Sequence, residues 1–231
     1  MNAMTEGHLA QETTADYLLH DLQWDESIYA MHEALGKEGT LGRNNETEVV
    51  LARYLGQKLI ELNPGLPMEA YEDALRIVNE YSSSSVTLAT NREKDSLHKN
   101  GVEVGFRNEK GERVKKRLRL FDFDNPANNH FLVVREFWIK GDLYRRRADI
   151  VCFVNGIPLV FMELKNIHKD IKTAYEKNLA DYKDTIPHIF HHNAFIVLGN
   201  GVDAKIGSVS SKFEHFNDWK RLHEDSPGVV N

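Results

Sequence analysis

The sequence is poor in cysteine and has no long apolar runs, and each shortage excludes a class of protein. Its 231 residues include one cysteine, Cys152, which excludes a disulfide framework and a cysteine-based zinc site. Such cysteine usage suits a reducing cytoplasm, where we expect the protein to lie. No apolar run approaches a membrane span, and the first 30 residues carry several acids instead of a basic and then apolar leader. We therefore expect neither a membrane span nor secretion.

The formal net charge is −6, which by itself argues against a nucleic-acid partner. The charge is unevenly distributed, however. Residues 1–100 hold 8 Lys and Arg against 17 Asp and Glu, whereas residues 101–150 hold 12 against 8. The basic residues gather between Arg107 and Arg119, including Lys115 and Lys116, and in the triplet Arg145, Arg146 and Arg147. Clustered positive charge predicts phosphate binding, and the alternative is a hairpin whose charges are merely solvated.

The order of patterns predicts an α/β fold in which helices flank a mixed sheet. Within 1–90, apolar spacing predicts helices over 11–22, 49–62 and from Pro67 to Val78, and the serine run 82–85 reads as a hinge. β-branched and aromatic runs predict strands over 102–106, 113–123, 131–139, 148–154, 159–164 and 195–198. Two further helices are expected over 171–182 and 213–222. We expect a helical region at 1–90 that packs on a core at 91–231, together forming one compact domain.

The segment from Arg147 to Lys165 carries the chemistry. Two nearly continuous apolar strands joined by Asn155-Gly156 contain three ionisable residues: Asp149, Glu163 and Lys165. Such strands are usually buried, and burying an unpaired charge costs free energy. We therefore expect the three ionisable groups to interact with one another.

The length of the hairpin loop decides whether these groups meet. A two-residue loop pairs Val154 with Ile157 and leaves Glu163 on the face opposite to Asp149. A three-residue loop pairs Val154 with Pro158 and sets Asp149 directly across from Glu163, with Lys165 on the same face. We therefore predict the three-residue loop or an equivalent bulge.

Two facing carboxylates repel each other unless a cation lies between them. An all-oxygen site favours Mg²⁺ or Mn²⁺, with the backbone carbonyl of Leu164 as a further ligand. Such an ion activates water and polarises a phosphoryl oxygen, while Lys165 complements the developing negative charge. The alternative is an Asp/Glu/Lys ion-pair network without metal.

Further motifs accompany these residues. They are Asp122-Phe-Asp-Asn-Pro-Ala-Asn-Asn-His-Phe-Leu-Val-Val134, Arg147-Ala-Asp-Ile-Val151, Phe153-Val-Asn-Gly-Ile-Pro-Leu-Val160, Glu163-Leu-Lys-Asn166, Ile186-Pro-His-Ile-Phe190, Gly199-Asn-Gly201 with Ala204-Lys-Ile-Gly-Ser208, and Gln11-Glu-Thr-Thr-Ala-Asp-Tyr-Leu18. Together they resemble PD-(D/E)xK nucleases, and specifically the N-terminal endonuclease domain of the motor (R) subunit of type I restriction enzymes.

This resemblance implies a restriction-endonuclease-like core and Mg²⁺-dependent cleavage of double-stranded DNA. By resemblance Asp149 and Glu163 are metal ligands, Lys165 is the catalytic lysine, and Glu12 matches an acidic residue that approaches the metal. The family's partners are methyltransferase and specificity subunits, and its ATP requirement belongs to motor domains. This sequence has no Gly-x-x-x-x-Gly-Lys-Ser/Thr loop, so we expect a fragment of a longer subunit.

The chain departs from the family pattern at two positions. Ala148 replaces the proline of the PD motif, and Asn178 replaces the glutamine of a Gln-x-x-x-Tyr motif that ends at Tyr182. Spacing of four puts Asn178 and Tyr182 on one helix face. Asn178 is expected to contact DNA or the active-site lysine, and Tyr182 either shares such a role or is simply a core aromatic residue.

Three readings of function remain open from the sequence: the nuclease domain, an inactive nuclease-like module that binds DNA or docks subunits, and a free-standing nuclease of the same superfamily. The neighbouring His188, His191 and His192 suggest a metal site, but we interpret them as surface histidines because a fourth ligand is missing.

Overall fold

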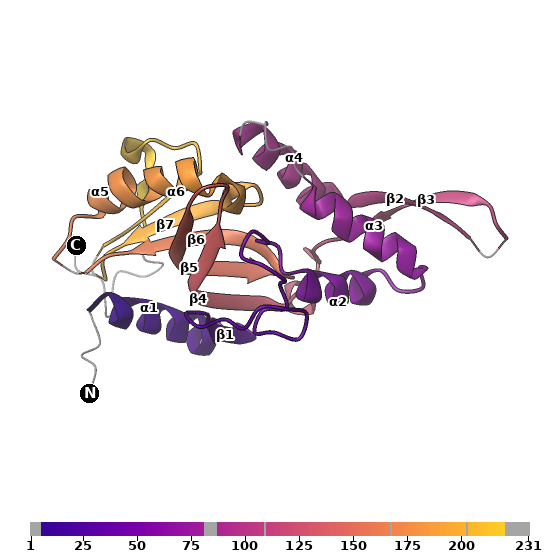
Figure 1. Ribbon diagram of the computed structural model, residues 1–231, viewed down its shortest axis with the longest axis horizontal. Helices are drawn as coiled ribbons and strands as arrows, with labels where there is room; N and C mark the ends of the chain where they lie inside the picture. Colours follow the sequence, from indigo (N-terminus) through magenta and orange to yellow (C-terminus); the bar gives the residue numbers. More distant parts are fainter. Residues whose placement is uncertain (1–5, 81–86, 109, 167, 202, 220–231) are drawn as a thin grey trace.

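A mixed seven-stranded sheet forms the centre of the protein, seen in a computed structural model that describes residues 6–80, 87–108, 110–166, 168–201 and 203–219 (Figure 1). The strand order is β1-β4-β5-β6-β7-β8-β9, with parallel pairing in β1–β4 and β6–β7 and antiparallel pairing elsewhere. The bounds are β1 Glu26–Tyr29, β4 Phe131–Lys140, β5 Arg145–Val154, β6 Ile157–Leu164, β7 Phe195–Gly199, β8 Ala204–Gly207 and β9 Asn217–Asp218. The predicted α/β fold is confirmed.

Helices cover both faces of this sheet (Figure 1). On one face lies α1 (Glu6–Asp16), continued by the π-helix η1 (Tyr17–Asp21), with Ala15 and Leu18 packed on Ile150 and Cys152. On the other face α5 (Ile171–Thr173), the π-helix η3 (Ala174–Leu179) and α6 (Ala180–Thr185) form one run of helix. Buried residues of this run join the largest core cluster with residues of the central strands. The predicted helices over 11–22 and 171–182 are both present.

A second core lies at the other end of the molecule. There α2 (Ala52–Leu62), α3 (Met68–Asn79) and α4 (Thr87–Asn100) accompany the separate hairpin of β2 (Val102–Arg107) and β3 (Arg113–Leu118). The helices over 49–62 and 67–78 are confirmed, α4 was missed, and the serine run 82–85 lies outside the described residues. The proposed division at residue 90 falls within α4 and stays a prediction. None of the helices in the described ranges is long and apolar enough to cross a bilayer.

The expected closing helix over 213–222 is wrong for its described part. Phe213–His215 forms a single 3₁₀ turn, and the chain then continues as the edge strand β9. Phe216 lies against Gly207, where an added Cβ would come within 2.7 Å of its ring. One 3₁₀ turn repeats every three residues, so it produces the same apolar spacing as the start of a helix.

The β5–β6 hairpin combines a two-residue turn with a bulge. Val154 pairs with Ile157, and Asn155 and Gly156 both have positive φ, +52° and +79°. The three-residue loop is therefore wrong. The register shifts one step further on, because Phe153 pairs with Pro158 while Cys152 pairs with Val160, leaving Leu159 as an extra residue. This is the equivalent bulge that was predicted.

Side chains from distant parts of the chain hold the turn. The Asn155 amide donates to the carbonyl of Leu120 at 2.8 Å and to Oδ1 of Asn129 at 2.9 Å. Asn129 in turn accepts from the backbone N–H of Asp122 at 2.9 Å. The backbone N–H of Leu51 donates to the carbonyl of Gly156 at 2.8 Å. The motif from Asp122 to His130 therefore supports the turn.

We predict that Gly156→Ala destabilises the protein much more than Gly65→Ala. Both glycines have φ near +80°, but a Cβ at Gly156 would lie 2.6 Å from the carbonyl oxygen of Leu51, whereas nothing lies within 4 Å at Gly65. Positive φ alone costs an L-residue about 1–2 kcal/mol, so Gly65→Ala is the matched control. Urea unfolding should show a further loss of about 1–3 kcal/mol for Gly156→Ala. Equal losses in the two variants would contradict the role of this close approach.

Candidate active site

Asp149 and Glu163 lie where β5 and β6 separate. The ladder between these strands ends at Ile150 and Met162, so each carboxylate occupies the next position on its strand. The backbone N–H of Leu164 donates to Oδ2 of Asp149 at 2.8 Å. A carboxylate thus takes the hydrogen bond that a neighbouring strand would otherwise accept.

Glu163 is almost fully buried, with a side chain 1% exposed. Its Oε1 accepts from Nζ of Lys165 at 2.5 Å and from the amide of Asn178 at 2.6 Å. Its Oε2 is also buried but accepts no hydrogen bond from any described residue. One carboxylate oxygen is therefore fixed in place while the other remains available to a ligand.

Helix α1 reaches Asp149 through Gln11, whose amide donates to Oδ1 at 3.1 Å. Gln11 is buried, whereas Glu12 is half-buried and forms no hydrogen bond or ion pair within the described part of the chain. The role of Glu12 near a metal stays a prediction. Gln11, Ala15 and Leu18 share one helix face, so the spacing of the buried residues could have identified Gln11.

Glu136 is a further carboxylate that sequence reasoning missed. Its neighbours on β4, Arg135 and Phe137, pair with Ile150 and Ala148, which puts Glu136 opposite Asp149. Glu136 is 1% exposed, has φ +58° and forms an ion pair with Nε of Arg147 at 2.6 Å. Interruption of the apolar run of β4 by a charged residue was the available signal.

Burial and mutual repulsion govern the protonation of the two carboxylates. Burial, followed by the charge of Asp149, raises the pKa of Glu163 to about 7, although Lys165 acts in the opposite direction. Burial also raises the pKa of Asp149, with the Leu164 N–H and the charge of Lys165 opposing that rise. A cation at this place would favour the ionised form of both groups.

Asn178 and Tyr182 both point from the covering helix run towards the central strands. Asn178 lies in the π-helical segment, and its amide contacts Glu163. Tyr182 is buried in the core, and its hydroxyl donates to the carbonyl of Arg147 at 3.0 Å. The DNA contacts expected of the two residues stay predictions, and the structure instead connects them to the carboxylate site. Single π turns inside helices often occur at functional sites.

Each arginine of the triplet has a carboxylate partner. Arg145 pairs with Glu46, Arg146 pairs with Asp181, and Arg147 pairs with Glu136. Their predicted contact with DNA phosphates stays a prediction, but these ion pairs would compete with it. Lys115 and Lys116 lie apart from the triplet, on β3 of the separate hairpin.

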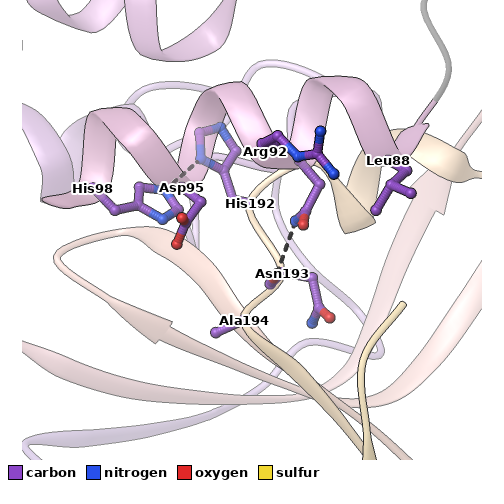
Figure 2. Close-up of a pocket in the computed structure, with 8 residues that line it drawn as sticks. Leu88, Arg92, Asp95, His98, His192, Asn193 and Ala194 are labelled. Carbon is purple, nitrogen blue, oxygen red and sulfur yellow. Dashed lines mark hydrogen bonds between the residues drawn. The ribbon is translucent and has the colours of Figure 1, made fainter. Parts of the chain in front are cut away.

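The interpretation of His188, His191 and His192 as surface residues is wrong, because all three are buried. His192 Nδ1 lies 2.9 Å from Nε2 of His98 on α4, and the rings stack (Figure 2). His98 and His192 line a pocket of about 330 Å³ between α4 and the residues before β7. Burial lowers the pKa of His98, His188 and His191 to about 4. The contact between His98 and His192 joins α4 to the residues before β7.

The donor set at Asp149 and Glu163 fits a hard divalent cation. Oε2 of Glu163 is an orphaned buried oxygen beside a second carboxylate, and Mg²⁺ is commonly held by one or two carboxylates with waters. No cluster of three or more His, Cys, Asp or Glu side chains suited to a metal occurs in the described ranges. Two carboxylates would therefore carry most of the protein's contribution. The predicted ligation by the Leu164 carbonyl stays a prediction.

Comparison with known proteins gives one consistent result. A family model described as Type I restriction enzyme R protein N terminus matches residues 3–215. The chain is 32% identical over 191 residues to the Type I restriction enzyme HindI endonuclease subunit of Haemophilus influenzae, covering 81% of this chain and 18% of that subunit. It is 32% identical over 131 residues to the putative MjaIXP endonuclease subunit of Methanocaldococcus jannaschii, covering 54% and 12%. The chain thus spans less than a fifth of these curated relatives.

We predict that Glu163→Gln gains stability relative to the wild type as pH rises from about 5 to about 8, without divalent cations. A carboxyl whose pKa is raised in the folded state binds its proton more tightly there, so its contribution is present below the unfolded pKa of 4.5 and is lost through about 7. One pKa unit corresponds to about 1.4 kcal/mol, so the gain should reach about 1–3 kcal/mol.

Denaturant unfolding of both proteins across this range measures the difference. The comparison is needed because the buried histidines, whose pKa is lowered, give the wild type an opposite slope between about 4 and 6.5. Parallel pH profiles for the two proteins would contradict the raised pKa of Glu163.

Proposed function

Because this chain belongs to the family of type I restriction enzyme R protein N termini, we propose that it hydrolyses phosphodiester bonds of double-stranded DNA with Mg²⁺ or Mn²⁺. In this proposal it is the endonuclease domain of a restriction system's R subunit. The relatives' names support the nuclease assignment. The metal is inferred from the chemistry of the site, and the DNA substrate is inferred from the family to which the chain belongs.

One observation carries the proposal. Two carboxylates, the half-buried Asp149 and the buried Glu163, lie together with the ammonium of Lys165, and one oxygen of Glu163 has no partner among the described residues. An internal ion-pair network alone would be expected to satisfy that oxygen, because an unpaired buried polar atom costs about 1–3 kcal/mol. A site for an external cation accounts for it.

A divalent cation held by Asp149 and Glu163 would polarise a phosphoryl oxygen and lower the pKa of bound water. The protein's own residues prepare for this step. Gln11 and the Leu164 N–H orient Asp149, and Asn178 orients Glu163.

Lys165 places positive charge where the phosphoryl oxygens become more negative during attack by water. Water supplies the new P–O bond, the P–O bond to the leaving oxygen breaks, and that oxygen takes up a proton. The pentacoordinate arrangement between these events is what the site must stabilise.

The chain matches only a small part of each curated relative, so other functions of the complex would belong to other domains or subunits. Curated relatives are several times longer than the matched region. We propose that methyltransferase and specificity subunits are partners, and that any ATP requirement belongs to motor domains elsewhere in the subunit. Cleavage would then depend on delivery of DNA to this domain.

We predict that Glu163→Ala and Lys165→Ala each reduce Mg²⁺-dependent nicking of plasmid DNA by at least ~100-fold, within the complete restriction complex. Supercoiled plasmid is converted to the open circle and measured on gels over time. Lys99→Ala is the control, because Lys99 forms an exposed ion pair with Asp95 on α4. Equal nicking by all four proteins would exclude this mechanism and favour an inactive DNA-binding or docking module.

We also predict that Mg²⁺ stabilises the chain through the same carboxylates. At ~10 mM Mg²⁺ and a Kd of ~1 mM, binding adds about 1.4 kcal/mol, which is about 3–5 °C in Tm for a chain of this size. Asp149→Asn should lose this shift. Asp73→Asn, which removes a partly exposed carboxylate paired with Arg76, should keep it. A shift retained in Asp149→Asn would place the cation elsewhere.

A further inference from the structure

The hairpin of β2 and β3 stands apart from the seven-stranded sheet and presents one free face. In Figure 1 it projects from the end of the molecule that carries α3, away from α5 and α6. Its inner face is apolar, since Val102, Val104 and Leu118 are buried in the core cluster that includes residues of α3. Residues that alternate with these point to the opposite, outward side.

The outward face is strongly basic. Cross-strand pairing places Arg107 opposite Arg113, Gly105 opposite Lys115, and Glu103 opposite Arg117. All of these residues are exposed. In the described part of the two strands, this face thus carries four cations and one carboxylate. We call these five charged residues with Gly105 the outward face.

Internal partners do not neutralise this charge. Glu103 is shared between Lys115, at 2.7 Å, and Arg117, at 3.7 Å. Arg113 forms no hydrogen bond or ion pair with any described residue. Arg107 donates from Nη1 to the carbonyl of Gly111 at 2.8 Å, and its backbone N–H donates to the carboxylate of Glu69 at 3.3 Å. Like charges directly opposite in a sheet destabilise it by roughly 0.2–1 kcal/mol. An anionic ligand would offset the repulsion between Arg107 and Arg113.

The regular spacing of the cations on the outward face, and the absence of apolar side chains from it, favour phosphates as the ligand. Cations two residues apart on one strand lie about 7 Å apart, and a DNA strand carries one phosphate per ~3.4 Å of helix axis. Protein interfaces instead place aromatic and apolar residues at their centre, where this face has Gly105. A two-stranded β-ribbon is also a shape that fits against a DNA groove.

We propose that the outward face of the β2–β3 hairpin binds the phosphate backbone of double-stranded DNA. This surface is separate from the carboxylate site, and its partner rests on the proposed function. Lys116 does not belong to it, because Lys116 pairs with Val104 and therefore lies on the inner side, at its exposed margin. The hairpin would hold the duplex at a distance from the cut, while the carboxylates act on one strand.

The test measures binding of the 231-residue chain to a fluorescent 30-base-pair duplex in EDTA, so that cleavage plays no part. The outward variant combines Arg113→Gln, Lys115→Gln and Arg117→Gln. The control combines Arg76→Gln, Lys99→Gln and Lys172→Gln, which removes three cations of similar exposure from helical ion pairs. Circular dichroism and Tm establish that both variants are folded.

The outward variant should bind DNA about 10–100-fold more weakly at ~100 mM salt, and the slope of log K against log salt should fall by about 2–3. The control should change the Kd by less than about threefold. Glu103→Gln should tighten binding several-fold, a gain that misfolding cannot produce, because it frees Lys115 and Arg117.

Equal weakening in the outward variant and the control would overturn the proposal, as would undetectable binding by the wild type at ~50 mM salt. Displacement by polyglutamate as effective as displacement by duplex DNA would also overturn it, in favour of an acidic protein partner. Binding of DNA by Glu163→Gln with the same affinity as the wild type would show that binding at the hairpin does not depend on the cleavage site. If nicking fails while this binding pattern holds, the hairpin proposal stands and the proposed catalysis fails.

Discussion

The constraint on which this structure depends is the placing of two carboxyl groups together, the half-buried Asp149 and the buried Glu163. Neither carboxylate can be withdrawn from water without partners, and besides Lys165 these partners come from three different layers. Gln11 comes from the helix on one face, Asn178 from the helix run on the other, and the Leu164 N–H from the neighbouring strand. The site consequently exists only when both helix layers have packed on the sheet. Local stability and chemical competence are therefore coupled.

The register that brings the carboxylates together is determined at the other end of their hairpin. A slip of one residue would move Glu163 to the opposite face, so the extra residue at Leu159 is as necessary as the carboxylates themselves. Leu159 is fixed in turn by its carbonyl, which accepts from the backbone N–H of Ala194 at 2.7 Å. The segment around Asn129 touches neither carboxylate, yet it belongs to the same unit because it holds the Asn155 turn.

The sequence predicted the central strands and the three charged residues because alternation and the cost of burial are local rules. The prediction of the loop length was wrong because two valid signals conflicted. Asn155-Gly156 favours a two-residue turn, whereas the alignment of the two carboxylates requires one additional residue in the hairpin. The structure satisfies both by moving the extra residue to Leu159. The prediction that the three histidines lie at the surface was wrong for another reason. His192 meets His98 across 94 residues of sequence, and no local pattern reports such a contact.

The two clusters of basic residues differ in their ion pairing, although their density of charge in the sequence is similar. Those of the triplet 145–147 are balanced by carboxylates from three separate elements, and they hold strands and helices together. On the outward face, Lys115 and Arg117 share the carboxylate of Glu103, and neither Arg107 nor Arg113 forms an ion pair with a described residue. At physiological salt, charges are screened within about 8 Å, so a projecting hairpin presents its own charge to a ligand and not the total of the chain. The net charge of −6 is therefore compatible with a DNA partner.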